Sequence, residues 1–161
     1  MTDKEMKLER FKEENKNAVK GQIVLTGSSL MEMFPVNKFL DERGLDITVY
    51  NRAIGGYITD ELMKVLDTCV FELEPRRVFI NIGTNDLSDS RIPMNRIMEH
   101  YDSIISSIEQ RLPKTEIYLM AYYPVNYEAV PENPNKRKDN GGKCTCKTAC
   151  GKARSALYRY K

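Results

Sequence analysis

The chain has 161 residues, a length that fits a single domain with a substantial buried core. It contains no apolar run near twenty residues and no hydrophobic N-terminal signal region, so the sequence predicts no membrane span and favours a cytoplasmic location. The net charge of +2 hides a division, because residues 136–161 hold nine basic residues and one acidic residue. This tail has a net charge of +8, and residues 1–135 have a net charge of −6. A basic tail on an acidic body is typical of nucleic-acid binding, or of two unrelated pieces joined together.

The first half of the body alternates between helical and extended patterns. Residues 2–20 are highly charged and predict an N-terminal helix. Short apolar or β-branched runs at residues 22–26 and 46–51, each followed by glycine, predict two strands. A helix follows, with Thr59 as its N-cap and Pro75 as its stop, because apolar residues recur between them at helical spacing.

The second half repeats the pattern with a strand at residues 77–82, a helix at 94–112 and a strand at 116–121. The helix is defined by an apolar stripe at i, i+3, i+4 and i+7: Met94, Ile97, Met98, Tyr101, Ile104, Ile105, Ile108 and Leu112. Strands that alternate with helices of this length form parallel units, because parallel strands require crossover connections. The near-continuous apolar strands indicate that both faces of the sheet are covered. The sequence therefore predicts an α/β fold, a three-layer α/β/α sandwich.

The loops after the first three strands are the candidate functional segments, because sites in such sheets form at the carboxyl ends of the strands. They are Thr26 to Leu30, Asn51 to Gly56 and Gly83 to Asp86. Ser29 would begin a helix with its hydroxyl exposed, and Asn85 offers an amide donor that could reach the same point. Each motif alone is also ordinary turn and cap chemistry, so the argument rests on their order along successive strands.

The segments VLTGSSL, NRAIGG and INIGTNDL resemble the first three conserved blocks of the SGNH hydrolases, also called GDSL-type esterases and lipases. The resemblance covers residues 22–125 and implies a flavodoxin-like parallel sheet. It also implies that Ser29 is the nucleophile, and that the N–H groups of Ser29 and Gly56 and the amide of Asn85 form an oxyanion hole. The implied substrate is a small acyl ester, and no metal or organic cofactor is implied. Ser28 stands where the family most often has Asp, and Tyr57 could either wall the acyl pocket or simply pack.

The family's general base is a histidine in a later Asp-x-x-His block, and this sequence contains no such block. The chain has one histidine, His100, which lies in the predicted helix 94–112 and is interpreted as a solvated surface residue. The resemblance therefore implies a domain over residues 1–135 that is truncated after the fourth strand, and a hydrolase impaired by loss of its histidine. The fourth strand would be an exposed apolar edge through which two copies could pair.

Two other functions stay open at this point. The first is a non-catalytic domain that keeps the oxyanion pocket for a ligand or a partner. The second, which the sequence favours less, is a flavodoxin-like phosphate site at residues 27–29, because neither a glycine-rich cradle nor an acidic ribose-binding residue accompanies it.

The tail, residues 136–161, holds three closely spaced cysteines, Cys144, Cys146 and Cys150. A zinc site lacks a second pair of ligands at zinc-finger spacing, and Cys69 belongs to a helical core stripe. Disulfides are unusual without an export signal, and a nucleic-acid arm would lack an accompanying fold motif. The favoured hypothesis is a tail translated out of frame, because a one-base shift turns each cysteine codon into Val or Ala and allows an apolar strand at the end. We therefore expect no metal and no nucleic acid to bind the tail, and sequencing of the encoding DNA tests this.

Overall fold

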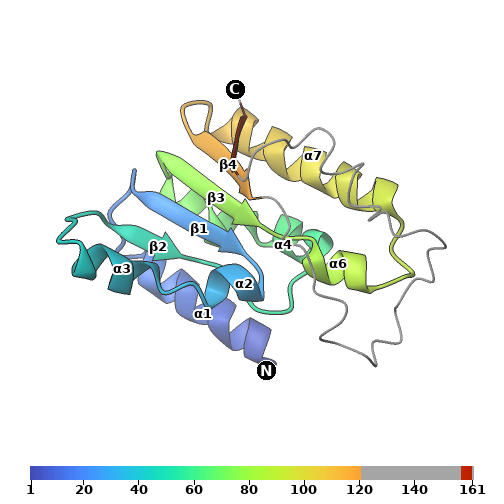
Figure 1. The fold of residues 1–161 in the computed structure, drawn as a ribbon, viewed down its shortest axis with the longest axis horizontal. Coiled ribbons are helices and arrows are strands. Elements are labelled where there is room, and N and C mark those ends of the chain that lie inside the picture. Colours follow the sequence, from blue (N-terminus) through green and yellow to red (C-terminus); the bar gives the residue numbers. More distant parts are fainter. Residues whose placement is uncertain (121–156, 161) are drawn as a thin grey trace.

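The computed structural model describes residues 1–120 and the backbone of residues 157–160. One sheet contains the strands β1 (Ile23–Gly27), β2 (Val49–Asn51), β3 (Arg77–Asn81), β4 (Glu116–Met120) and β5 (Leu157–Tyr160). Their order in the sheet is β2-β1-β3-β4-β5 (Figure 1). The pairs β1–β2, β1–β3 and β3–β4 are all parallel. The predicted parallel sheet is confirmed, with the second strand at one edge and the fourth strand beyond the third.

The fifth strand comes from the basic tail and was not predicted. β5 pairs antiparallel with β4, from Ile117 opposite Tyr160 to Met120 opposite Leu157. The prediction that β4 is an exposed edge, open to a second copy, is therefore wrong. Backbone N–H and C=O groups at a sheet edge pair with any extended segment that reaches them, and here that segment belongs to the same chain. The three cysteines of the tail lie outside the described residues, so the hypothesis about the reading frame stays a prediction.

The described helices are α1 (Asp3–Asn15), α2 (Ser29–Glu32), α3 (Val36–Glu42), α4 (Thr59–Lys64), α5 (Leu66–Cys69), α6 (Thr84–Ser88) and α7 (Met94–Arg111). Helices α1 and α7 confirm the predictions for the two longest helical patterns. The predicted helix from Thr59 toward Pro75 is instead divided into α4, α5 and a 3₁₀ turn, because Val65 (φ −118°) and Val70 (φ −139°) leave the helical backbone region. Among the described residues, no helix is both long enough and apolar enough to cross a membrane.

Different helices cover the two faces of the sheet, which confirms the three-layer architecture (Figure 1). Neighbouring residues on a strand point to opposite faces, and Val24 and Leu25 of β1 belong to different cores. Val24 belongs to the larger core, to which α1, α4, α5 and α7 contribute buried side chains. Leu25 belongs to a smaller core with Met31 of α2, against which α3 packs. Cys69 is fully buried in the larger core, and burial raises the pKa of its thiol to about 12, so it stays protonated.

A glycine at the end of β1 determines how the first loop leaves the sheet. Gly27 has a φ of +137°, and a Cβ atom there would lie 1.9 Å from the carbonyl oxygen of Asn81 on β3. The next residue, Ser28, donates its N–H to the same oxygen over 3.0 Å. Only glycine combines this backbone angle with so close an approach, so Gly27 fixes where Ser29 and α2 begin.

We predict that Gly27→Ala lowers the free energy of unfolding by at least about 3 kcal/mol, the combined cost of a strained backbone and of overpacking. Gly44→Ala is the matched control, because Gly44 also has a positive φ (+60°) but has nothing within 4 Å of the position of its Cβ. It should cost only about 1–2 kcal/mol. Urea denaturation measures both, and equal losses would contradict the close contact.

Candidate active site

The three predicted site residues follow the carboxyl ends of three adjacent parallel strands, β1, β2 and β3. Ser29 is the first residue of α2 after β1, and Asn85 is the second residue of α6 after β3. Gly56 lies in the loop between β2 and α4. Ser29 and Asn85 are half-buried and Gly56 is exposed, so all three reach the protein surface. The parallel register therefore brings them to the same edge of the sheet.

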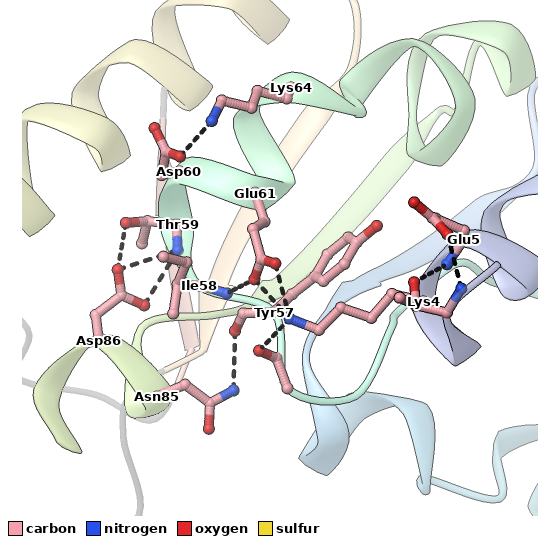
Figure 2. A network of polar contacts seen from close by, with 12 residues as sticks. Lys4, Glu5, Tyr57, Ile58, Thr59, Asp60, Glu61, Lys64, Asn85 and Asp86 are labelled. Carbon is pink, nitrogen blue, oxygen red and sulfur yellow. Dashed lines mark hydrogen bonds and ion pairs between the residues drawn. The ribbon is translucent and has the colours of Figure 1, made fainter. Parts of the chain in front are cut away.

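Direct contacts also connect the three loops that carry these residues. The Asn85 side-chain amide donates from Nδ2 to the carbonyl oxygen of Tyr57 over 2.9 Å, directly beside Gly56 (Figure 2). On the other side, a Cβ atom built on Gly55 would lie 3.8 Å from the Cβ of Ser29. The loop that carries Gly56 is therefore in contact with both of the other two loops.

Several hydrogen-bond donors at this edge have no acceptor within the described residues. The N–H of Gly56 makes no hydrogen bond to residues 1–120. The N–H of Ser29 belongs to the first turn of α2, whose amides have no intrahelical acceptor. Asn85 uses one amide hydrogen on Tyr57 and retains a second. The Ser29 hydroxyl also has no hydrogen-bond partner in the described part of the chain.

A buried carboxylate next to Asn85 fixes the start of α4. Both carboxylate oxygens of Asp86 accept the N–H of Thr59, over 3.0 and 3.1 Å, and one of them also accepts the Thr59 hydroxyl (Figure 2). Thr59 was predicted to be the N-cap of this helix, and that prediction is wrong. Thr59 is the first residue within α4, and Asp86 supplies the capping oxygens from α6.

The chain's only histidine belongs to the same network. His100 Nδ1 lies 3.0 Å from the Thr59 hydroxyl oxygen. Because the hydroxyl proton of Thr59 goes to Asp86, the oxygen accepts and His100 Nδ1 donates. His100 is half-buried rather than a solvated surface residue, which corrects the interpretation of the sequence. Its place beside the N-terminus of α4 explains why it lies off the apolar stripe of α7.

Two further side chains support the loop after β2. Asn51 donates from Nδ2 to the carbonyl of Met31 in α2 over 2.7 Å and accepts the N–H of Ala53 over 3.1 Å. Tyr57 is buried in the larger core, so of its two predicted roles the structure supports packing. Burial raises the pKa of the Tyr57 phenol to about 12, and the phenol is therefore neutral at physiological pH. The sequence drew attention to the loop but assigned no role to Asn51, because its partner Met31 lies twenty residues away along the chain.

Two hollows in the described part of the chain, of about 560 and 350 Å³, are lined by residues other than Ser29, Gly56 and Asn85. The described residues also contain no cluster of three or more His, Cys, Asp or Glu side chains that could hold a metal ion.

A comparison with protein families decides the class of this chain. The sequence model of the GDSL-like lipase/acylhydrolase family matches residues 36–142, a range that contains Gly56 and Asn85. The chain belongs to the GDSL-like lipase/acylhydrolase family. Ser29 precedes the matched range, so its assignment depends on the GSS motif and on its position after β1.

Solved structures share the fold of this GDSL-like chain. A Streptococcus pneumonia protein described as a candidate platelet activating factor is 30% identical, with a TM-score of 0.69 over 80% of this chain and 61% of that one. A GDSL-like lipase from Bacteroides thetaiotaomicron is 20% identical, with a TM-score of 0.62 over 73% and 59%. The esterase EstA from Pseudoalteromonas sp. is 21% identical, with a TM-score of 0.56 over 67% and 63%. This chain thus spans about three fifths of their length. No curated protein matches it.

We predict that Asp86→Asn lowers the free energy of unfolding by about 3 kcal/mol, because an amide cannot replace the charged acceptor at both oxygens. Asp67→Asn is the control, since Asp67 is exposed and, among the described residues, pairs only with the exposed Arg111. It should change the stability by less than about 1 kcal/mol. Thermal or urea unfolding measures both, and similar small losses would show that the Asp86 network does not hold α4.

Proposed function

We propose that this protein is a serine ester hydrolase that acts on small acyl esters through Ser29, with Gly56 and Asn85 in its oxyanion hole. The observation that carries the proposal is the gathering of these residues from three strand ends, with Asn85 bonded to the carbonyl beside Gly56. Membership in the GDSL-like family supports an acyl-transfer reaction. The esterase EstA, inhibited by monoethylphosphonate, has the same fold, which supports an ester as the substrate class.

The proposed reaction begins with attack of the Ser29 hydroxyl oxygen on the ester carbonyl carbon. The carbonyl oxygen becomes an anion as the tetrahedral intermediate forms, and the N–H groups of Ser29 and Gly56 and the amide of Asn85 stabilise it. Donors of this kind contribute about 3 kcal/mol each to the transition state, because they are already oriented when the charge develops. The alcohol then leaves, and water hydrolyses the acyl-serine.

The proton of Ser29 needs an acceptor for this attack to be fast. Two observations support the proposal that residues 1–120 lack this base: the Ser29 hydroxyl has no hydrogen-bond partner there, and His100 is hydrogen-bonded to Thr59. Loss of the base from a serine-hydrolase triad lowers turnover about a million-fold, and the oxyanion hole alone retains about a thousand-fold over water. We therefore propose that this 161-residue chain is an impaired hydrolase.

We predict that the chain hydrolyses p-nitrophenyl acetate slowly, and that added imidazole increases the rate by supplying the missing base. The increase should exceed the background reaction of imidazole with the ester, and Ser29→Ala should abolish the excess. Ser106→Ala is the matched control, because Ser106 is exposed on α7, away from the strand ends. Release of p-nitrophenolate, with protein-free imidazole as the blank, measures all three.

Two outcomes of this assay would contradict the proposal in different ways. Equal rates for Ser29→Ala and the unmodified chain would remove Ser29 as the nucleophile. Fast turnover without imidazole that Ser29→Ala abolishes would instead show that another group in the chain serves as base.

A second candidate function is a non-catalytic binding domain for a carboxylate. The Ser29 hydroxyl, which has no partner among residues 1–120, favours it, because the N–H donors beside it can hold a stable anion where chemistry is absent. Acetate titration followed by NMR distinguishes the two: saturable shifts of the Gly56 and Asn85 amide signals, together with a Ser29→Ala variant that retains the basal rate, would favour binding.

A further inference from the structure

The N-terminal helix α1 reaches the loop that carries Gly56, although it lies outside the range matched by the family. Lys4 Nζ donates to the carbonyl oxygen of Gly56 over 2.9 Å (Figure 2). The same ammonium group lies 2.8 Å from both carboxylate oxygens of Glu61 and 5.1 Å from the centre of the Tyr57 ring. Glu61 also accepts the N–H of Ile58 over 3.0 Å. One lysine of α1 therefore joins the Gly56 carbonyl to the first turn of α4.

A second lysine, one helical turn further along, acts on the other side of Gly56. Lys7 Nζ pairs with Glu32 Oε1 over 2.8 Å, and Glu32 Oε2 accepts the N–H of Gly55 over 3.1 Å. Gly55 is packed so closely that a Cβ atom would lie 2.5 Å from that carboxylate oxygen. Hydrogen bonds that Lys7 donates to the carboxylates of Asp3 and Glu32 raise its pKa above the ordinary value of 10.5, so Lys7 is charged at physiological pH.

These contacts fix two peptide groups, and the N–H of the peptide group between them is left without an acceptor among residues 1–120. Glu32 accepts a hydrogen bond from the peptide group between residues 54 and 55, through the Gly55 N–H. Lys4 donates one to the peptide group between residues 56 and 57, through the Gly56 carbonyl. The peptide between them contains the Gly56 N–H, which has no acceptor among residues 1–120. Two glycines in succession would otherwise be free to rotate this peptide, since neither has a Cβ to restrict its backbone.

The far end of α1 is anchored to the same loop. Arg52 is buried, lies 3.0 Å from Glu14 and donates to Asn15 over 2.9 Å. Its guanidinium also lies 4.8 Å from the ring centre of Phe11, which is buried in the larger core. Because Lys4, Lys7 and Phe11 are three and four residues apart, they share one face of α1. That face spans the loop from Arg52 to Gly56.

We propose that α1 is a positioning element of the active site, in which Lys4 and the Lys7–Glu32 pair hold the Gly55–Gly56 peptide so that its N–H is preorganised for the oxyanion. The inference rests on the proposed ester-hydrolase function. The lysines do not touch the substrate and act only through the loop. Their ion pairs are partly exposed, and such pairs add little to global stability, so their removal should change the loop more than the fold.

The test compares Lys4→Met with Lys12→Met in the full chain. Lys12 is the matched control, because it lies on the same helix and its one ion pair within residues 1–120 is with the exposed Glu9. For Lys4→Met we expect the imidazole-assisted rate to fall roughly tenfold to a hundredfold, because misplacement of a donor lowers turnover while substrate binding changes little. The Michaelis constant and the melting temperature should stay unchanged, and Lys4→Arg should recover much of the rate. Lys12→Met should behave as the unmodified protein.

A second measurement tests the proposed role of α1 without depending on the hydrolysis of an ester. In ¹⁵N-labelled protein, Lys4→Met should shift and broaden the amide signals of Gly56 and Tyr57 and speed their hydrogen exchange, and Glu32→Gln should do the same at Gly55. If Ser29→Ala shows no loss of activity, the proposed function fails, and these amide signals alone decide whether α1 holds the loop. Amide signals and rates that match those of Lys12→Met would overturn the proposal, as would a loss of rate explained entirely by a lower melting temperature.

Discussion

The packing of Gly27 against the backbone of Asn81 is the contact on which the candidate site depends. It allows β1 to run beside β3 to its last residue, so that the first loop leaves the sheet next to the third. The N–H of Ser28 is bonded to the same carbonyl, and Ser29 therefore begins α2 at a fixed place. A side chain at position 27 would separate β1 from β3 at the ends from which the loops of Ser29 and Asn85 leave the sheet. The rest of the site is arranged around this junction.

The loop with the two glycines is held by side chains from three helices. Lys4 of α1 binds its carbonyl, Glu32 of α2 binds one of its N–H groups, and Asn85 of α6 binds the carbonyl of the following residue. Asp86 then fixes Thr59, where the loop enters α4. Each bond is modest alone, but a connected network in a partly dry environment restrains a flexible segment better than its separate members do. The two glycines allow neighbouring groups to come close to the loop backbone, and the surrounding polar contacts hold that backbone in one conformation.

The sequence predicted the parts of this protein that depend on local pattern. The strand order and the gathering of Ser29, Gly56 and Asn85 followed from apolar runs that end in small residues, because parallel strands place their carboxyl ends together. The break in the helix at Val65 was missed, since periodicity does not show which turn loses its helical angles. The roles of Asp86 and His100 were also missed, because their partner Thr59 is distant along the chain and only the packed structure brings them together. The fifth strand was also missed, because its pairing partner β4 is distant along the chain.

The most direct test of the central claim is a crystal structure of the protein after reaction with a small organophosphonate in the presence of imidazole. The account predicts a covalent bond from phosphorus to Ser29 Oγ. It also predicts that the phosphonyl oxygen lies about 3 Å from both the Gly56 nitrogen and Asn85 Nδ2. A phosphonate on another residue, or a phosphonyl oxygen that contacts neither donor, would contradict the assignment of this surface as an acyl-transfer site.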